Sequence, residues 1–351
     1  MSHDGSTQTD NKAITPLVTM KRLLLIISSI LTLTACSNEG MLVSPKGAKI
    51  AFGESHIDNT TRKAIDGSYS GTKNLTAFKV YGTVTGNGYT LPLYENGADV
   101  TGEVGDAVWG CTIEQYWVPK CTYKFIAIAD ATSVSLTNGM PTTITYNENT
   151  TANGDLLLAI VDDTTNDQAV PAKGNPVEFT FIHLLSKAKF TFTKNAYSNT
   201  RYTFNVKNIK FTDAYKQGTY TINANDANGG TWGSQGVEGE ILFGNLEDII
   251  TTENAATGLQ SRNERQFVPA KYTKQNPLTV QFDVVMMLDD TELSTVTYTK
   301  QIPASDATYN EYEFVKGNAY NFGVTLGDNN LITFKVDEID GWDSKTDISI
   351  P

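Results

Sequence analysis

The chain has 351 residues, 40% of them hydrophobic and 10% aromatic, and its formal net charge at pH 7 is −12. This length is enough for two ordinary domains with a core in each. The acidic balance argues against a nucleic-acid-binding protein, because such proteins use lysine and arginine to neutralise phosphates.

Residues 20–36 have the organisation of an export signal that ends in a lipid attachment site. Lys21 and Arg22 form a positive n-region, and the apolar h-region runs from Leu23 to Leu33. Leu33-Thr-Ala-Cys36 is a lipobox, in which the cysteine thiol takes a diacylglyceryl group. The apolar run is shorter than the roughly 20 residues of a membrane-spanning helix. A short anchor or a buried helix is the alternative interpretation.

We therefore expect Met20 to be the true start and residues 1–35 to be a signal peptide with an upstream extension. Residues 1–35 hold three basic and two acidic residues, so the remainder of the chain carries a charge of −13. Lipidation of Cys36 would tether this remainder to a bacterial membrane, because each buried acyl CH₂ group stabilises the bound state by about 0.8 kcal/mol.

Strands dominate the pattern from residue 49 to residue 181. Phe78 and Val80 alternate with Lys79, which is typical of a strand with one wet face. Residues 156–161 are apolar on both faces and predict a central, covered strand.

Two cysteines remain after Cys36 is assigned to lipid. Cys111 and Cys121 are separated by nine residues, and in an oxidising compartment they predict one disulfide. The alternative is a pair of unpaired buried thiols. The spacing does not fit a zinc site, and no histidine is close in the sequence.

An aromatic cluster surrounds these cysteines. Trp109, Tyr116 and Trp117 could form a platform that stacks on sugar rings. The structural interpretation, which we favour, places them in the core on neighbouring strands, because aromatic residues prefer strands and bury large areas.

A domain boundary is expected at the end of this first set of strands. His183 shares an alternate face with Phe179 and Phe181, and we interpret it as a hydrogen-bonded histidine at a domain join rather than as a general base. We place one β-sandwich domain at residues 36–183 and a second at 184–351. No proline-rich or serine-rich linker separates them, which predicts close contact.

In the second half of the chain, apolar and polar residues again alternate with a period of two. The alternating runs are 188–192, 278–286, 320–326 and 332–336. The alternation slips near Lys207-Asn208, which predicts a bulge or a break in that strand. The one helical candidate is 245–257. Gly/Asn turns such as Asn138-Gly139 separate the strands, so the sequence predicts an all-β protein of two tandem sandwiches.

Catalytic and metal motifs are absent from the sequence. His56 lies in a polar segment where we expect it to be exposed, and the acidic pairs 162–163, 289–290 and 337–338 lie at strand ends, where solvated turns are the usual explanation. No nucleophile elbow, P-loop, zinc motif or dinucleotide fingerprint occurs. We expect a protein that is not an enzyme and has no cofactor.

Several segments, in order, resemble the fimbrillin-like proteins, the lipoprotein-derived pilins of Bacteroidales type V pili. After the lipobox these are Ile50-Ala-Phe52, Thr60-Thr-Arg62, 74–82, Trp109, Tyr116-Trp117-Val-Pro119, 123–127, 181–190, Gly317-Asn-Ala-Tyr320 and 332–342. Each motif by itself has low specificity. The resemblance rests on the order of the motifs together with the lipobox.

The resemblance implies transthyretin-like sandwich domains and a precursor that is lipidated on Cys36 and carried to the outer membrane. It also implies that a trypsin-like protease cuts after an arginine, for which Arg62 is the best match. The loss of the first strand would then let a strand of another fimbrial subunit fill the groove, in a homo- or heteropolymer. Receptors on host or bacterial surfaces would be the partners in adhesion. Residues 343–351 could form a short strand.

The sequence leaves two rival functions open. One is a glycan-binding surface lipoprotein that uses the tryptophan cluster, and the other is an accessory protein of a glycosidase or protease.

Overall fold

The computed structural model describes residues 48–53, 55–57, 75–86, 88–103, 105–118, 121–148, 154–163, 175–195, 200–223, 225, 229–236, 238–251, 258–261, 263–305, 307–327, 332–340 and 344–348. The chain divides into two compact units, Met1–Pro45 and Lys46–Pro351, and the described residues all belong to the second. The predicted signal peptide, Cys36 and Arg62 lie outside the described residues.

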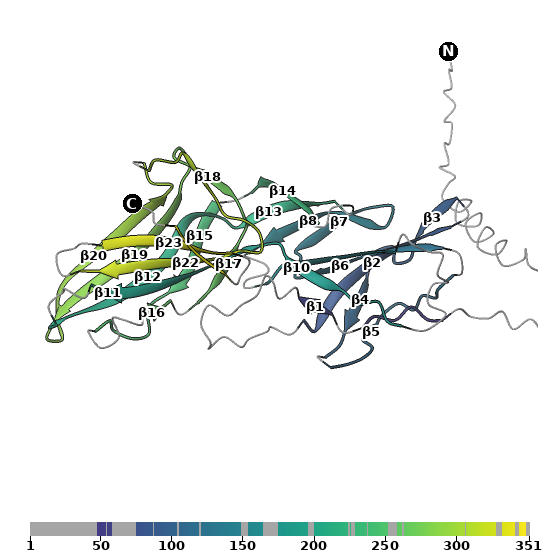
Figure 1. Ribbon diagram of the computed structural model, residues 1–351, viewed down its shortest axis with the longest axis horizontal. Coiled ribbons are helices and arrows are strands. Elements are labelled where there is room, and N and C mark those ends of the chain that lie inside the picture. Colours follow the sequence, from purple (N-terminus) through teal and green to yellow (C-terminus); the bar gives the residue numbers. More distant parts are fainter. Residues whose placement is uncertain are drawn as a thin grey trace, which may run out of the picture. The chain divides into compact units, whose positions relative to one another are not determined.

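The described part of the chain is all-β, as predicted, and contains no helix (Figure 1). The largest sheet has the strand order β1-β10-β9-β6-β2-β4-β5, with β3 paired to β2. Its strands are β1 (His56–Ile57), β2 (Ala77–Gly86), β3 (Tyr89–Pro92), β4 (Ala98–Thr101), β5 (Gly110–Cys111), β6 (Thr122–Ala129), β9 (Leu157–Asp163) and β10 (Thr180–His183). The strand β9 lies between β6 and β10 with its side chains alternating between two cores, which confirms the central, covered strand predicted at 156–161.

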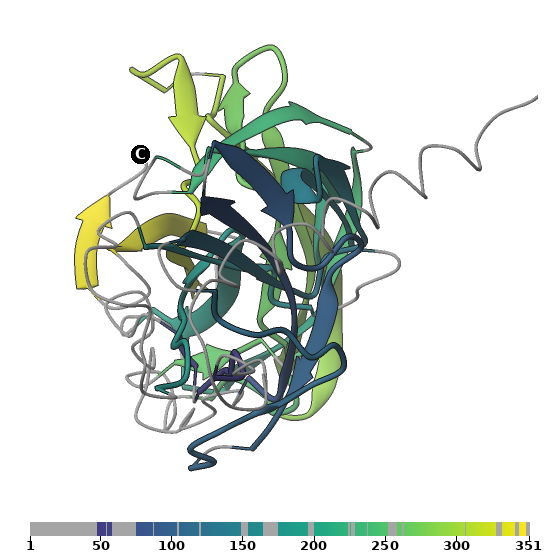
Figure 2. The same cartoon turned by 90° about the vertical axis from the view of Figure 1, so that its right-hand side faces the viewer.

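Two further sheets face each other in the C-terminal half. One has the order β16-β11-β22-β23-β24, with β17 paired to β11, and the other β15-β12-β19-β20. The strands of the first are β11 (Ser186–Lys194), β16 (Leu259–Gln260), β17 (Arg265–Phe267), β22 (Ala319–Leu326), β23 (Ile332–Asp340) and β24 (Ser344–Ile348). Those of the second are β12 (Tyr202–Tyr215), β15 (Glu238–Gly244), β19 (Leu278–Leu288) and β20 (Thr291–Ile302). Figure 2 shows the yellow C-terminal strands and the green β19–β20 region on opposite sides of the view.

Aromatic rings join the two facing sheets. Phe192 of β11 meets Phe282 of β19 in a T-shaped contact with ring centroids 5.2 Å apart. Such pairs stabilise a core by about 0.5–1.5 kcal/mol beyond the burial of their area. The alternation read from the sequence therefore places these phenylalanines on the two inner faces.

A fourth sheet, β14-β13-β8-β7, combines strands from both sides of the predicted boundary at 183/184. Its strands are β7 (Ser133–Thr137), β8 (Met140–Asn147), β13 (Gln217–Ile222) and β14 (Gly230–Gln235). Asn138 and Gly139, which join β7 to β8, have φ angles of 51° and 78°, as a tight hairpin requires. A fifth sheet pairs β18 (Lys271–Thr273) with β21 (Glu311–Glu313). The division into two tandem sandwich domains stays a prediction.

The predicted slip near Lys207-Asn208 is a bulge. The pairing of β12 with β19 shifts between Lys207 and Lys210, and Asn208 has a φ angle of 55°. The strand continues through the irregularity, because the bulge restores the inward direction of the apolar side chains after it.

The helix expected at 245–257 is not formed in its described part, 245–251. Ile250 makes an isolated bridge with Phe204 instead, with backbone hydrogen bonds of 2.7 and 3.0 Å in the two directions. This pairing with β12 provides partners for the backbone N–H and C=O groups of Ile250, which in a helix would bond within the helix.

Candidate functional site

The first segment, residues 48–53 and 55–57, lies as a strand between two other parts of the N-terminal half. On one side it is antiparallel to 109–117, where Trp109 N donates to Phe52 O over 2.8 Å and Trp117 N donates to Ala48 O over 2.9 Å. On the other side it runs parallel to 177–181, and Gly53 N donates to Val177 O over 2.9 Å. Residues 48–53 are therefore hydrogen-bonded on both edges, while β1 (His56–Ile57) pairs with β10 alone among the described residues.

The alternation in Lys49-Ile50-Ala51-Phe52 explains why this segment is a strand. Ile50 is 1% exposed and Phe52 is fully buried, whereas Lys49 points outward and forms an ion pair of 2.7 Å with Glu114. A Cβ at Gly53 would approach Pro176 to 3.1 Å, so glycine allows the close contact with the parallel neighbour.

Phe52 occupies the centre of the N-terminal core. Its ring lies 5.9 Å from those of Phe125 and Phe179 and 6.4 Å from that of Tyr94. Burial of one such side chain stabilises the folded state by about 1.5–3 kcal/mol. Loss of the first segment would thus leave an apolar groove with two unpaired strand edges.

The aromatic cluster read from the sequence is part of the same core. Trp109 is 3% exposed and packs on Phe78 at 5.7 Å, and Trp117 is 7% exposed and meets Tyr123 edge-on at 4.6 Å. Tyr116, which is half-buried, donates to Glu114 over 3.2 Å. A sugar-stacking platform needs exposed ring faces, and the two tryptophans have none to offer, so their burial favours the structural interpretation.

Trp109 also depends on a neighbouring glycine. A Cβ at Gly102 would lie 2.3 Å from the indole ring, so this position has no room for a side chain. The sequence motif Val108-Trp109 gave no sign of this dependence.

The structure records Cys111 and Cys121 as free cysteines, and the predicted disulfide is not formed in it. The Cys111 thiol donates to Ile113 O at 3.2 Å, while Cys121 is buried in the core. Burial raises the pKa of both thiols, which keeps them protonated and weakly reactive.

His56 and His183 have the exposure and the hydrogen bonding that the sequence analysis expected of them. His56 is exposed. His183 is buried, and its Nδ1 lies 2.8 Å from Oδ1 of the buried Asp155. The position of Asp155, 28 residues earlier in the chain, was not evident from the sequence.

Neither a metal centre nor a spanning helix emerges from these residues. Within the described ranges no three His, Cys, Asp or Glu side chains come together as metal ligands would. No helix that is long and apolar enough to cross a membrane occurs in the part of the chain that the structure describes.

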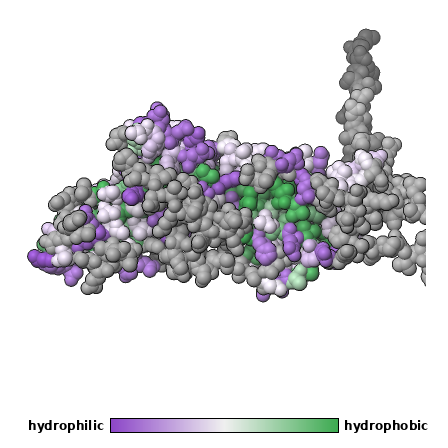
Figure 3. Space-filling model, in the orientation of Figure 1, coloured by the Kyte–Doolittle hydropathy of each residue, from purple (hydrophilic) through white to green (hydrophobic). Residues whose placement is uncertain are grey.

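Hydrophobic and hydrophilic residues are unevenly distributed on the face drawn in Figure 3. Hydrophobic residues gather in the region of β2, β6 and β10, and hydrophilic ones around β18.

Comparison with known proteins gives the family. The model of the fimbrillin-like family matches residues 61–342. No curated protein matches the sequence.

Among solved structures, a fimbrial protein from Bacteroides vulgatus superposes with a TM-score of 0.51 at 17% identity, over 83% of this chain and 99% of that one. A fimbrial assembly protein from Parabacteroides distasonis reaches a TM-score of 0.40 at 12% identity, over 86% of this chain and 97% of that one. The first likeness supports the fold. Because the family model covers most of the chain, the protein belongs to the fimbrillin-like family.

Proposed function

We propose that this protein is a fimbrial subunit that is exported as a lipoprotein and assembles by strand exchange after the first segment is removed. The family supports a fimbrial subunit on the cell surface. The observation that carries the finer proposal is the first segment itself, whose residues 48–53 are hydrogen-bonded on both edges and supply Phe52 to the core.

The position of Arg62 suits a cut that frees this segment. It follows the first segment and precedes β2 in the chain, and the flanking Thr60, Thr61 and Asp66-Gly-Ser68 are polar, as an accessible loop would be. A cut there would leave Ile50 and Phe52 on the released side and the rest of the sheet on the other.

The groove that remains would bind an extended strand. Main-chain hydrogen bonds to 109–117 and 177–181 would supply affinity, and alternate apolar side chains filling the places of Ile50 and Phe52 would set the register. An unpaired edge next to an apolar groove has a strong tendency to find such a partner.

The C-terminal strand β24 is a candidate donor. Among the described residues it pairs only with β23 and forms the end of its sheet. Detaching such an edge strand costs less free energy than detaching an internal strand, because it breaks hydrogen bonds to one neighbour and not to two. In the sequence, Ile348 and Ile350 alternate with Asp347 and Ser349.

The lipid on Cys36 would serve delivery in this scheme. It would hold the precursor on the outer membrane until the cut at Arg62 releases the subunit into a fimbrium, where it would support adhesion. The unmodified precursor should be found in the membrane fraction and need detergent for its release. With Cys36→Ala, we expect the precursor to be lost from the membrane fraction. An unchanged partitioning would argue against the lipid.

The processing step is tested by treating the purified full chain with an arginine-specific protease. We expect one early cut after Arg62, located by mass spectrometry, followed by oligomers that survive mild detergent. Arg62→Gln should stay intact and monomeric under the same conditions. Arg201→Gln, a change at an exposed arginine elsewhere, should behave as the unmodified chain.

A second experiment adds a synthetic peptide with the sequence of residues 46–58 to the cut protein. In excess it should refill the groove and suppress oligomers after the cut. A chain that is cut after Arg62 but stays monomeric, or oligomers that the peptide does not affect, would overturn the strand-exchange proposal.

A further inference from the structure

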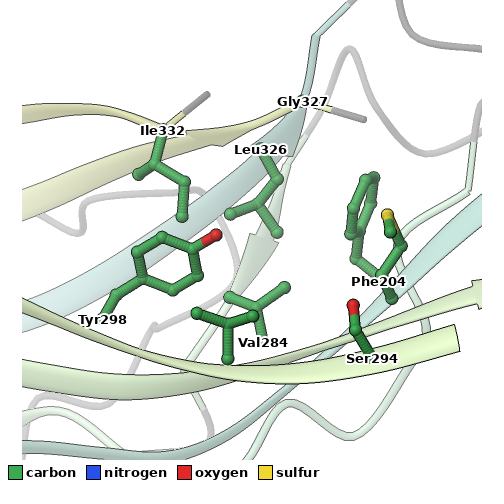
Figure 4. Close-up of a pocket in the computed structure, with 9 residues that line it drawn as sticks. Phe204, Val284, Ser294, Tyr298, Leu326, Gly327 and Ile332 are labelled. Carbon is green, nitrogen blue, oxygen red and sulfur yellow. The ribbon is translucent and has the colours of Figure 1, made fainter. Parts of the chain in front are cut away.

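The recess drawn in Figure 4 is too small to bind a ligand. Tyr298 of β20 and Leu326 of β22 project into it, and its volume is about 10 Å³. A cavity needs roughly 10–15 Å³ to hold one water molecule, so this recess is a gap in the packing. A cleft of about 600 Å³ in the N-terminal half is different, because small-molecule sites span roughly 300–1,000 Å³.

The floor of this cleft is the face of the large sheet that points away from the core around Phe52. One row of side chains crosses three neighbouring strands, where Lys79 of β2 lies between Ile128 of β6 and Asp99 of β4. The Nζ atom of Lys79 is 2.6 Å from Oδ1 of Asp99. The row alternates with residues such as Val80, which is buried in the core on the other side of the sheet.

The opposite wall of the cleft is formed by residues 130–132 and the start of β7. Asp130 has a φ angle of 57°, and its Oδ2 accepts a hydrogen bond of 2.9 Å from Asp155 N. Thr132 Oγ1 accepts a hydrogen bond of 2.9 Å from Asn147 N. The fold therefore holds both side chains in place, so this wall is organised before any ligand binds.

Tyr81 of β2 brings a buried hydroxyl group to the cleft. The residue is 3% exposed and lines the cleft, and no described residue forms a hydrogen bond with its hydroxyl. Burial, and then the charge of Asp99, raise the pKa of Tyr81 above its ordinary value, so the hydroxyl stays protonated and can donate. A Cβ at Gly97 would lie 2.7 Å from the Tyr81 ring and 2.8 Å from Lys79, so glycine leaves room for both side chains. The hydroxyl needs an acceptor from outside the chain, which a ligand supplies.

The chemistry of the cleft favours a neutral ligand that is rich in hydroxyl groups. The cleft is lined by one lysine and two aspartates, and this surplus of negative charge repels an anion. The ion pair with Lys79 already engages Asp99, and the backbone of Asp155 engages Asp130, so a cation finds no unpaired carboxylate. The other hydrogen-bonding groups are neutral and lie beside apolar side chains, with Tyr81, Thr101, Ser133 and Asn96 in the first set and Val134 and Leu136 in the second.

We propose that this cleft binds a neutral saccharide of one or two rings, whose hydroxyl groups bond to the Tyr81 hydroxyl and the Asp99 carboxylate. Separate hydroxyl groups on a sugar match polar side chains that lie at intervals over floor and wall, whereas a peptide strand is held by a continuous row of backbone groups. The site requires neither the cut at Arg62 nor the exchange of a strand. It also lies on the other face of the sheet from Trp109 and Trp117, which belong to the core around Phe52.

Binding is tested by NMR on the full, uncut, ¹⁵N-labelled chain with sugars at millimolar concentration. The neutral probes are glucose, galactose, mannose, N-acetylglucosamine, lactose and maltose, and sialyllactose is the anionic probe. We expect at least one neutral sugar to shift the amide signals of the cleft residues in a saturable way, and sialyllactose to bind more weakly. The proposal is overturned if no neutral sugar shifts these signals, or if sialyllactose binds more tightly than every neutral sugar.

Two variants connect the binding to the cleft. Tyr81→Phe retains the buried ring and should weaken sugar binding about tenfold, because one hydrogen bond is lost. Its matched control is Tyr89→Phe, at a tyrosine of β3 that is 68% exposed and does not line the cleft, and binding should be unchanged. Thr101→Tyr should abolish binding, because Thr101 is exposed on the cleft side of β4 and the larger side chain fills the space. Circular dichroism verifies that each variant is folded, and a sugar that binds both Tyr81→Phe and Thr101→Tyr as tightly as the unmodified chain contradicts the site.

An extended peptide is the rival occupant of the cleft. A synthetic peptide with the sequence of residues 343–351 is therefore added to the uncut chain, and we expect the signals of the cleft residues to stay unchanged. A peptide that shifts these signals where the sugars do not would show that the cleft binds a strand, and would overturn the saccharide proposal.

Discussion

The ring of Phe52 stacks on that of Phe179, with centroids 5.9 Å apart and an angle of 23° between their planes. The two residues come from neighbouring parallel segments, one on each side of the predicted cut at Arg62 in the chain. The contact thus links the segment that we propose to be removed with the sheet that would remain.

Phe52→Ala should destabilise the full chain by about 3–5 kcal/mol, since it removes a fully buried aromatic ring and leaves a cavity. Urea unfolding followed by tryptophan fluorescence measures the change. His56→Ala, an exposed change in the same segment, should stay within about 0.5 kcal/mol of the unmodified chain. Equal effects of the two changes would contradict the central position of Phe52.

Asn208→Ala should cost about 1–2 kcal/mol of unfolding free energy, because alanine is strained at a φ angle of 55°. The change also removes the 2.7 Å hydrogen bond from Asn208 Nδ2 to Asp283. Asn208→Gly relieves the strain and should recover part of the loss. Both variants lack the hydrogen bond to Asp283, so the difference between their thermal unfolding temperatures reports the backbone strain. A glycine variant that is less stable than the alanine variant would contradict the strain.

Asp155→Ala should destabilise the fold by about 1–3 kcal/mol, because it removes the buried acceptor 2.8 Å from His183 Nδ1. Asp155→Asn retains an oxygen in the same place and should cost less. Chemical denaturation of both variants at neutral pH is the measurement. If the asparagine and alanine variants are equally unstable, the hydrogen bond to His183 is not what stabilises this site.

Asp283 should make stability depend on pH in the acidic range. Hydrogen bonds from Thr297 Oγ1 at 2.6 Å and Asn208 Nδ2 at 2.7 Å hold the pKa of Asp283 below its ordinary value of 3.8. The folded state therefore favours the charged carboxylate. This contribution is fully present above the unfolded pKa and is lost as pH falls through the folded one.

The test compares the unmodified chain with Asp283→Asn at pH 7 and at pH 3. The stability advantage of the unmodified chain should shrink at the lower pH, and Thr297→Val should raise the pKa of Asp283 in an NMR titration. A difference between the two chains that does not change with pH would refute this role of the carboxylate.

Much of the fold could be read from the period of two and from its interruptions. The slip at Lys207-Asn208 predicted the bulge, because one extra residue reverses the face of every later side chain. Asn138-Gly139 predicted a hairpin, because both positions need positive φ. The helix at 245–257 was wrong over its described part, where pairing of Ile250 with β12 outweighs a weak local preference.

The sequence by itself determined the all-β class, the family resemblance and the direction in which most side chains point, because alternation is a local property of each strand. Only the tertiary structure decided which strands pair. It placed β8 beside β13 across the predicted boundary, put Trp109 and Trp117 in the core, and left Cys111 and Cys121 unbridged. It also gave residues 48–53 a hydrogen-bonded neighbour on each edge, since Phe52, Trp109 and Val177 are far apart in the chain and meet only because the fold brings their backbones within hydrogen-bonding distance.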